Sequence, residues 1–291
     1  MRPSRPLLSL LLSPLLSQAP SPSPSASPSP ARPLPVRLSA ALFRAAALEA
    51  VLLAGHLLLY PTGMTGERRS RRSRRSTQAH PVGAEPPALL LHGLADNRSA
   101  FIVLRRALSR RGRRPECLNY SLLTCDVRTA AELLSRHVEE VCAHSGHARI
   151  DLVGHSLGGL VARYYVQRLG GDRRVRTLVT LGTPHAGTSA VPAASLHPLV
   201  RQLRPGSSVL RELEEPAPGC RTRFVGVWSD LDQLMSPVEA ARIDHPDLRA
   251  ENIRVTGIGH LALLFHPAVA AAVHDALAAQ PGGTSDSTAV A

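Results

Sequence analysis

The sequence predicts an α/β fold in which a mostly parallel sheet is flanked by helices, with a small helical cap insertion. Short apolar runs with strand character alternate with segments whose apolar residues recur at helical spacing. Such alternation gives a parallel sheet, because each helix returns the chain to the edge where the next strand begins. The pattern extends over residues 84–280, which is long enough for one hydrophobic core.

The first predicted strand, Ala88–Leu91, runs into His92-Gly93-Leu94, and a later one, Ile150–Val153, runs into Gly154-His155-Ser156-Leu157-Gly158. A helical pattern follows. A G-x-S-x-G sequence between strand and helix is the setting of a nucleophile elbow, in which a sharp turn exposes the serine hydroxyl. Side chains at positions 154 and 158 would obstruct the close approach of strand and helix. Ser156 is therefore the candidate nucleophile; the alternative is a small-residue turn that holds a serine by chance.

Backbone amides beside this serine predict a site for a negatively charged oxygen. In an elbow, the residue after the nucleophile donates one N–H, and the loop after an earlier strand donates the other. The pattern assigns these donors to Leu157 and Leu94. Two such donors typically lower a barrier by roughly a few kcal/mol. His92, at the start of the same loop, is interpreted as a residue that orders the loop rather than one that carries a proton.

A serine nucleophile needs a base, and histidine is the usual one. Among the 13 histidines, His260 follows the last predicted strand, Ile253–Thr256, in a glycine-rich loop. His266 and His274 are alternatives, but both favour structural roles, because the first precedes a proline at a helix start and the second falls within a helical pattern. His260 is the predicted base.

The base in turn needs a carboxylate that orients it. The predicted strand Thr222–Trp228 is followed by Ser229-Asp230-Leu231-Asp232, so either aspartate is a candidate. Asp232 is preferred, since Asp230 is placed to cap the turn through its own side chain. The resulting chain order is serine, aspartate, histidine, which is the order found in α/β-hydrolases.

Four motifs carry a resemblance to a known family: His92-Gly93, Gly154-His155-Ser156-Leu157-Gly158-Gly159, the run Thr180–Thr188, and Gly257-Ile258-Gly259-His260-Leu261. Together, over about Pro86 to Ala279, they resemble the small bacterial triacylglycerol lipases and esterases of the α/β-hydrolase superfamily. The resemblance implies an α/β-hydrolase fold and hydrolysis of carboxylic esters through an acyl-enzyme, with no metal and no organic cofactor. It assigns the catalytic roles as nucleophile Ser156, acid Asp232, base His260, and oxyanion donors Leu94 and Leu157.

Two other function classes remain open. An acyltransferase would use the same triad, with a sterol, sugar or amine that intercepts the acyl-enzyme before water. A non-catalytic, membrane-associated protein with a hydrolase-like fold is the other class, although the complete set of triad candidates opposes it. The expected substrate is a lipid or a small ester, of which the sequence specifies neither the acyl chain nor the alcohol.

A helical excursion at residues 187–219 interrupts the alternation of strands and helices. Short amphipathic faces recur there, one made by Leu196, Leu199, Val200 and Leu203 and another by Val209, Leu210 and Leu213. Hydrolases of this superfamily insert a cap at this place, where apolar inner faces line an acyl pocket and exclude water. A plain surface hairpin is the alternative.

The N-terminal part of the chain has a different composition. Residues 1–37 form a low-complexity tail rich in Ser and Pro, in which Leu7–Leu16 has the length of a signal-peptide core. Residues 38–62 form an apolar helix that is long enough to span a bilayer, yet it contains Arg44, Glu49 and His56. Membrane association and packing on the core both remain open for this helix. The predicted location is secreted or membrane-associated.

An arginine-rich linker, residues 63–83, follows the helix, and residues 281–291 form a predicted disordered tail. Six arginines between Arg68 and Arg75 contribute to the net charge of +12. A basic run beside an apolar helix favours contact with anionic lipid. Nucleic acid is not an expected partner, because no aromatic residues interleave with the arginines.

The cysteines do not indicate a metal or redox site. Their four positions, Cys117, Cys125, Cys142 and Cys220, contain no C-x-x-C spacing. Their even number permits disulfides in an exported protein, while Cys117 in a predicted strand and Cys142 on a helix face suit buried thiols equally well. The sequence leaves the pairing open.

Overall fold

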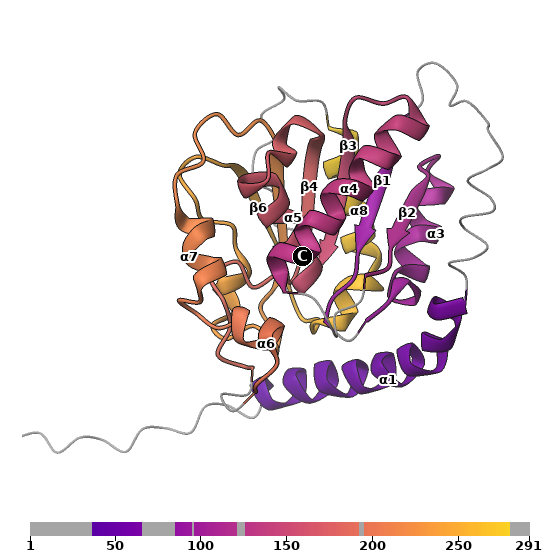
Figure 1. The fold of residues 1–291 in the computed structure, drawn as a ribbon. Helices are drawn as coiled ribbons and strands as arrows, with labels where there is room; N and C mark the ends of the chain where they lie inside the picture. The colour runs from indigo at the N-terminus through magenta and orange to yellow at the C-terminus, as the bar shows by residue number, and fades with distance from the viewer. Residues whose placement is uncertain (1–36, 66–84, 95, 121–125, 192–194, 280–291) are drawn as a thin grey trace, which may run out of the picture. The chain divides into compact units, whose positions relative to one another are not determined.

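The structure is a computed structural model, which describes residues 37–65, 85–94, 96–120, 126–191 and 195–279. Its sheet has six strands in the order β2-β1-β3-β4-β5-β6, and every neighbouring pair is parallel (Figure 1). The strands are β1 (Ala88–Leu91), β2 (Pro115–Leu118), β3 (Ile150–His155), β4 (Val175–Leu181), β5 (Arg223–Ser229) and β6 (Arg249–Val255). The predicted α/β fold with a parallel sheet is thus confirmed.

Helices cover both faces of this sheet. One apolar cluster joins the sheet to α4 (Val127–Ser145), α5 (Leu157–Arg168), α6 (Pro198–Gln202) and α7 (Ser208–Glu214). A second cluster joins the other face to α3 (Ile102–Arg110) and α8 (Pro267–Ala278). Short 3₁₀ helices complete the chain as η1 (Arg98–Phe101), η2 (Gly171–Arg173), η3 (Val238–Ala241) and η4 (Leu261–Leu264).

The order of the strands reverses at β1, which lies between β2 and β3. In an open parallel sheet, the loops that leave the two strands at such a point diverge and form a crevice outside their carboxyl ends. The loop after β1 carries Leu94, and the turn after β3 carries Ser156. The topology therefore brings two of the predicted site segments to neighbouring positions at one edge of the sheet.

The last strand begins earlier than the sequence pattern indicates. The pattern predicts a strand from Ile253, whereas β6 begins at Arg249 and ends at Val255. Its first half is polar, with exposed or partly exposed side chains. Because β6 is an edge strand, it pairs on one side only and can carry polar residues that hide the usual apolar alternation. Cys117, expected in a strand, lies in β2.

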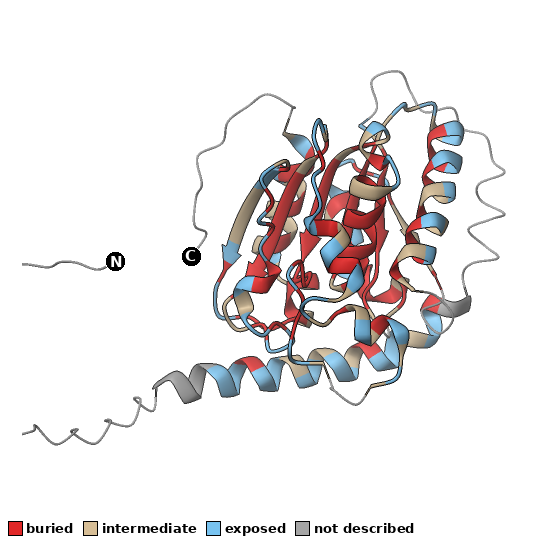
Figure 2. Ribbon diagram, turned by 60° about the vertical axis from the view of Figure 1, so that its left-hand side comes forward, coloured by how far each residue is buried: buried red, intermediate tan, exposed pale blue. Residues whose placement is uncertain are grey.

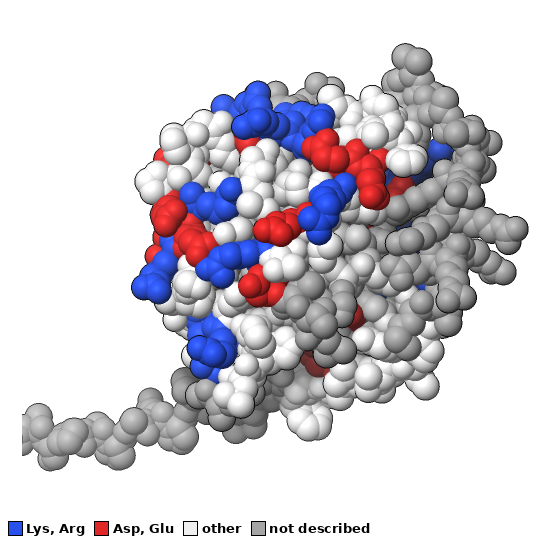
Figure 3. All heavy atoms as spheres, in the orientation of Figure 1, with Lys and Arg blue, Asp and Glu red and all other residues white. Residues whose placement is uncertain are grey.

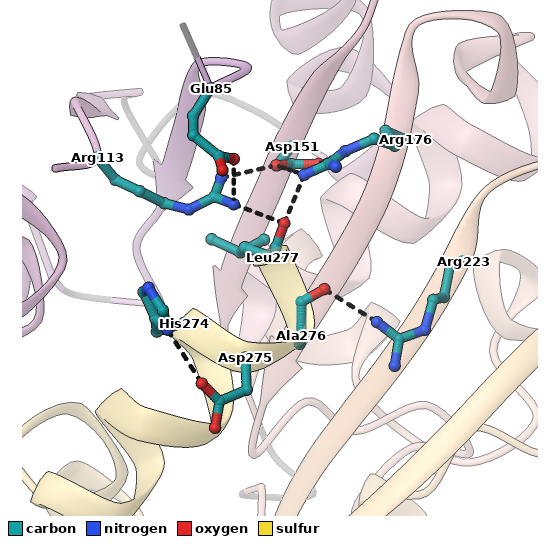
Figure 4. Close-up of polar contacts among 9 residues, drawn as sticks. All are labelled: Glu85, Arg113, Asp151, Arg176, Arg223, His274, Asp275, Ala276 and Leu277. Atoms are coloured by element: carbon teal, nitrogen blue, oxygen red, sulfur yellow. Dashed lines mark hydrogen bonds and ion pairs between the residues drawn. The ribbon is translucent and has the colours of Figure 1, made fainter. Parts of the chain in front are cut away.

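A buried carboxylate ties the amino edge of the sheet to the end of α8 (Figure 4). Asp151, in β3, contacts Arg113 at 3.1 Å and Arg176 at 2.6 Å. Both arginines also donate to the carbonyl oxygen of Leu277, near the end of α8. The carboxylate therefore has partners for its charge, as a buried ion requires, and the arginines satisfy a carbonyl that the helix leaves unpaired.

The cap insertion lies between β4 and β5 and contains α6 and α7. Its leucines at 199, 203, 210 and 213 are buried in the same cluster as α4 and α5. Leu196, which the sequence pattern placed on the same apolar face, precedes α6 and is 87% exposed. Helix α6 begins only at Pro198, so the helical rhythm does not include position 196.

Helix α1 (Arg37–Thr65) belongs to the same unit as the sheet, Val36–Ala291. It runs past η1 and η4, which follow β1 and β6 (Figure 1). Ala45 and His56 are buried and Leu52 packs against the second cluster, while most of the other described side chains of α1 are exposed (Figure 2). The helix thus packs by one face on the domain that contains the sheet, which is one of the alternatives that the sequence left open.

Other expectations concern segments outside the described residues. They are the apolar run Leu7–Leu16, the Ser- and Pro-rich tail, the arginine run Arg68–Arg75, and Cys125. Cys117, Cys142 and Cys220 are described, and all three are free thiols.

Candidate active site

Ser156 lies at a strained turn between β3 and α5. Its φ of 52° and ψ of −123° make it the one non-glycine residue with positive φ in the described part of the chain. A hydrogen bond of 2.8 Å from its N–H to the carbonyl of Leu181 fixes the turn against β4. The residues on either side are buried, while Ser156 itself is partly exposed. Strain held by the surrounding structure is typical of functional positions.

The glycines that flank this turn are required by close packing. A Cβ atom at Gly154 would lie 2.4 Å from the Cα atom of Gly159, and one at Gly158 would lie 2.3 Å from the carbonyl oxygen of Leu91. Both are backbone atoms that cannot move aside. This agrees with the steric reason for which the sequence pattern was interpreted as an elbow.

Asp232 and His260 meet at the carboxyl edge of the sheet. The Asp232 Oδ2 atom lies 2.7 Å from Nδ1 of His260, and both side chains are buried. The other carboxylate oxygen of Asp232 accepts the N–H of Leu234 at 3.0 Å. This leaves the Nε2 atom of His260 as the ring nitrogen that is not engaged by the carboxylate.

The alternative residues lie elsewhere. Asp230 accepts the N–H of Gly257 and pairs with Arg254, each at 3.0 Å, which is the turn-capping role considered for it. His266 is the N-cap residue of α8, and His274 contacts Asp275 at 3.0 Å on the exposed side of that helix. The structure therefore brings His260 together with Asp232. It does not bring Asp230 to His260, and it brings neither His266 nor His274 to Asp232.

His260 also lies beside the nucleophile turn. Its ring centroid is 4.7 Å from that of His155, the residue that precedes Ser156, and the His155 Nε2 atom lies 3.4 Å from the carbonyl oxygen of His260. Three of the predicted catalytic residues thus occupy one small region. They come from the turn after β3, the loop after β5 and the loop after β6.

Opposing effects act on the charge of His260. Burial alone would lower the pKa of its imidazole, but the charge of Asp232 and the hydrogen bond to it, with smaller contributions from Glu49 and Asp96, raise the pKa above its usual value. A histidine stabilised in its protonated form is suited to accept a proton from a serine during attack.

The predicted oxyanion donors border the same turn. A Cβ atom at Gly93 would lie 3.2 Å from that of Ser156, so the loop that carries Leu94 packs against the nucleophile. Leu157 is the first residue of α5, where a backbone N–H has no acceptor within the helix. Both amides belong to segments adjacent to the serine, and the positive end of the α5 dipole adds to the local field.

His92 orders the loop after β1. Its ring stacks on that of Tyr120 at a centroid distance of 4.5 Å, and its Nδ1 atom lies 3.0 Å from the carbonyl oxygen of Gly93. The hydroxyl of Tyr120 donates to the carbonyl of His92. Burial lowers the pKa of His92, so that its neutral form is favoured.

Threonines of the Thr180–Thr188 motif connect the loops of the site. The Thr183 hydroxyl donates to the carbonyl of Ser156 at 2.9 Å. The Thr188 hydroxyl donates to the carbonyl of Leu234 and accepts the N–H of Ser236, at 2.8 and 3.0 Å. The motif therefore holds the nucleophile turn and the loop that carries Asp232 in fixed positions.

Two residues of α1, which sequence reasoning had treated only as polar interruptions, approach the site. Glu49 accepts the N–H groups of Leu261 and Ala262, directly after His260, at 2.8 and 2.9 Å. His56 lies 3.1 Å from Asp96. The signal that identifies them is their seven-residue separation, which puts both on one face of a helix.

Asp96 links α1 to the nucleophile turn. One of its oxygens lies 3.1 Å from Nε2 of His56, and the other lies 3.5 Å from Nδ1 of His155. Burial alone would raise the pKa of Asp96, but the two histidines outweigh it and lower the pKa well below its usual value. Asp96 is therefore a buried carboxylate that carries its charge between two imidazoles.

Among the described residues, no group of His, Cys, Asp and Glu is arranged to hold a metal ion. The chemistry available here is that of a serine hydroxyl, an imidazole, a carboxylate and backbone amides. Groups of this kind are suited to acyl transfer, in which a serine attacks a carbonyl, an imidazole moves the proton and amides bind the oxyanion.

Comparison with known proteins gives a family match and more distant relatives. Residues 87–235, just over half of the 291-residue chain, match the family described as palmitoyl protein thioesterase. Triacylglycerol lipases of Pseudarthrobacter phenanthrenivorans and Burkholderia plantarii are each 32% identical to the chain over 110 residues, or 35% of its length. These stretches cover 34% and 30% of the two relatives, so the chain matches about a third of each.

Solved structures share the fold. Lipase B of Aspergillus fumigatus has a TM-score of 0.60 at 16% identity, over 72% of this chain and 58% of that one. The mature BlEst2 lipase of Bacillus licheniformis has a TM-score of 0.58 at 15% identity, over 68% of this chain and 94% of that one. The predicted α/β-hydrolase fold is confirmed, and so is the resemblance to lipases and esterases.

Proposed function

The chain belongs to the palmitoyl protein thioesterase family, and on that premise we propose that it is a serine hydrolase that cleaves carboxylic esters through an acyl-enzyme. The observation that carries the proposal is the 2.7 Å contact between Asp232 and His260 beside a strained Ser156. Ser156 is the nucleophile, His260 the base and Asp232 the acid, with Leu94 and Leu157 as oxyanion donors.

The reaction has two halves. In the first, the Ser156 hydroxyl attacks the carbonyl carbon while Nε2 of His260 takes its proton, and the oxyanion is bound by the N–H groups of Leu94 and Leu157. Collapse of this intermediate breaks the bond to the leaving group, which receives the proton from His260. In the second half, His260 takes a proton from water, whose oxygen attacks the acyl-enzyme, and Ser156 leaves with that proton. Asp232 keeps Nδ1 of the imidazole protonated and oriented throughout.

The substrate is an acyl ester of a lipid or a small alcohol. The curated relatives are named triacylglycerol lipases, which favours an oxygen ester. The family description names a palmitoyl thioester, which favours a long acyl chain on sulfur as the second candidate. The same residues serve both, since only the leaving atom differs. A series of p-nitrophenyl esters of increasing chain length, compared with palmitoyl thioesters, separates the two.

Substitution of the nucleophile tests the proposed reaction. We expect Ser156→Ala to reduce kcat about a millionfold, because loss of a triad nucleophile removes the covalent step. It should also abolish labelling by a fluorophosphonate probe. Ser189→Ala is the matched control, since this serine is exposed and its hydroxyl bonds with Ser236, in the loop after β5. Retention of a tenth of the activity in purified Ser156→Ala would exclude the assignment.

The products decide between hydrolysis and acyl transfer. If water is the acceptor, free fatty acid remains the product when a sterol, sugar or amine is added in excess. Accumulation of the acylated acceptor instead would identify an acyltransferase that uses the same acyl-enzyme.

We also propose a membrane-associated location for the protein. The helical stretch Leu42–Gly63 is long and apolar enough to cross a bilayer, and only 11% of its most apolar window is buried against the rest of the molecule. Such exposure is unusual for the core helix of a water-soluble domain. Recovery of the full chain with the membrane fraction of its host tests this location.

A further inference from the structure

The outward side of α1 is almost entirely apolar. Between Leu42 and Leu59 the only polar side chains are Arg44, which is exposed, and Glu49 and His56, which both contact the hydrolase. Eight of the thirteen exposed large hydrophobic residues in the described part of the chain lie on this one helix. These eight, named here the outer face of α1, are Leu42, Phe43, Leu48, Val51, Leu53, Leu57, Leu58 and Leu59.

We propose that the outer face of α1 docks on an anionic lipid surface, with the helix lying flat on the bilayer. The inference rests on the membrane location proposed above and specifies the partner and the orientation. An interfacial helix normally has one polar and one apolar side. In α1 the hydrolase covers the polar side, so that the apolar remainder is left for the acyl region of a leaflet (Figure 2).

Contacts from Glu49 to Gly63 hold α1 against the surface of the hydrolase. Glu49 is hydrogen-bonded to η4, the carbonyl of Tyr60 accepts from Asn97 at 2.9 Å, and the carbonyl of Gly63 accepts from Asn119 at 3.0 Å. A helix that crossed the bilayer would have to break these bonds and bury Glu49 in hydrocarbon, where an ionised carboxylate is costly. The flat orientation retains all of them.

The charge next to this helix complements an anionic leaflet. Residues 37–75 contain eight arginines and two glutamates, and six of the arginines fall within 68–75. Arginines close to an apolar surface helix attract anionic headgroups. A second copy of the chain would satisfy the apolar face equally well, but both copies would carry the same net charge of +12, which opposes their association. Charge therefore favours lipid as the occupant.

Docking in this orientation would bring the active-site edge toward the bilayer. Segments η1 and η4, on which α1 packs, follow β1 and β6 at the carboxyl edge that carries Ser156 and His260 (Figure 1). In Figure 3 most of the coloured charged residues lie above the level of α1, and the lower margin of this view is largely white.

Vesicle flotation of the full chain tests the docking surface. The probes are vesicles of phosphatidylcholine with and without phosphatidylserine. The paired substitution of Phe43→Glu and Leu58→Glu places charge on two side chains that are 75% and 81% exposed. We expect it to reduce the bound fraction at least about tenfold while the melting temperature is unchanged, because neither side chain packs on the protein. Leu169→Glu, at the end of α5, is the control and should bind as the unsubstituted chain does.

Each outcome of the flotation experiment supports or overturns the proposal. Binding that needs phosphatidylserine, weakens with salt and is removed by alkaline extraction supports it. Resistance to alkaline extraction would show that the helix spans the bilayer, which overturns the orientation and keeps the membrane location. Absence of vesicle binding would overturn both. Self-association that the paired substitution abolishes, without vesicle binding, would identify a second copy as the occupant.

A different observation carries a second inference, about the inner face of α1. We propose that Glu49 is a positioning residue that holds the loop of the base, His260. Its two carboxylate oxygens accept the N–H groups of Leu261 and Ala262, the first residues of η4. The carboxylate also packs on Gly259, where an added Cβ atom would lie 2.5 Å from its carboxyl carbon. Both sides of His260 in the chain are therefore held by one side chain.

The charge of Glu49 acts on His260 together with three other groups. Asp232 faces the imidazole from the loop after β5, Asp96 from the loop after β1, and His155 from the end of β3. Each negative charge favours the protonated imidazole. Removal of the Glu49 charge therefore lowers the pKa of His260 and moves the acid limb of kcat/KM to lower pH.

The test compares Glu49→Gln with Glu140→Gln, a control on the exposed side of α4. We expect Glu49→Gln to reduce kcat by about tenfold or more and to displace the acid limb to lower pH, since glutamine retains one acceptor but no charge. The control should change neither. A stable Glu49→Gln variant with an unchanged pH profile and unchanged kcat would overturn the role of Glu49, whereas failure of the Ser156→Ala test would overturn the reaction itself.

Discussion

The residues of the site differ in how far the sequence reveals them. Ser156 is identified by a local pattern, because the elbow needs glycines on both sides of the nucleophile. Asp232 and His260 follow from chain order and from their position after strands. The spacing of Glu49 and His56 indicates a shared helix face, but the partners of Glu49 could not be predicted, because they are backbone amides 212 and 213 positions away, which leave no signature in the sequence.

The choice between the two aspartates gives a prediction for single residues. Asp232→Asn should reduce kcat on the order of ten-thousandfold, since the amide no longer fixes the correct tautomer of His260. Asp230→Asn should stay within about tenfold, because its partners are Arg254 and a backbone N–H outside the triad. Matched kinetics of both variants check this ranking, and the reverse order would reassign the acid.

Elements were predicted best where one face is buried. The rhythm of α4 matches its buried positions, and Asp126 and Gly146 cap its two ends. The start of edge strand β6 was harder to predict, since its polar first half lacks an alternation of apolar and polar residues. Helices α6 and α7 lie within the predicted excursion at residues 187–219, but the boundary of α6 excludes Leu196 from the buried face.

The packing of the cap insertion changes the expected effect of substituting its leucines. Leu199 is fully buried in the main cluster, so Leu199→Ala should lower the free energy of unfolding by about 2–5 kcal/mol. Leu196→Ala should leave stability within about 0.5 kcal/mol, because the side chain is solvated. Denaturant unfolding of both variants checks the difference. Equal, small losses would mean that the hairpin does not pack on the sheet.

At the scale of the whole molecule, the parallel sheet and its flanking helices can be predicted, because strand-like and helical patterns alternate along the sequence. The attachment of α1 does not, because an apolar helix with few polar residues suits a bilayer and a protein core equally well. One face of α1 is buried against the rest of the protein and the other face is exposed. The helix therefore combines packing on the core with an apolar surface suited to a membrane, the two alternatives that the sequence left open.

Truncation of the chain tests how α1 contributes to the whole. Deletion of residues 1–35 should leave the melting temperature within about 1 °C, since the Ser- and Pro-rich composition of this segment does not favour burial in a core. Deletion of residues 1–65 removes His56, one of the two partners of Asp96, and Glu49, the acceptor of the Leu261 and Ala262 amides, and it should lower the melting temperature by more than about 5 °C. Calorimetry of both truncated chains decides it; equal melting temperatures would mean that α1 does not stabilise the hydrolase.

The arginine contacts at the end of α8 have a practical consequence for handling the protein. Arg113, Arg176 and Arg223 hold the last carbonyls of this helix at the amino edge of the sheet, opposite the site (Figure 4). Asp275, on the same turn, has a side chain that is 75% exposed. A fluorophore or tether attached through Asp275→Cys would therefore hold the molecule at the amino edge of the sheet. An immobilised sample would then present its catalytic edge and α1 to the solution.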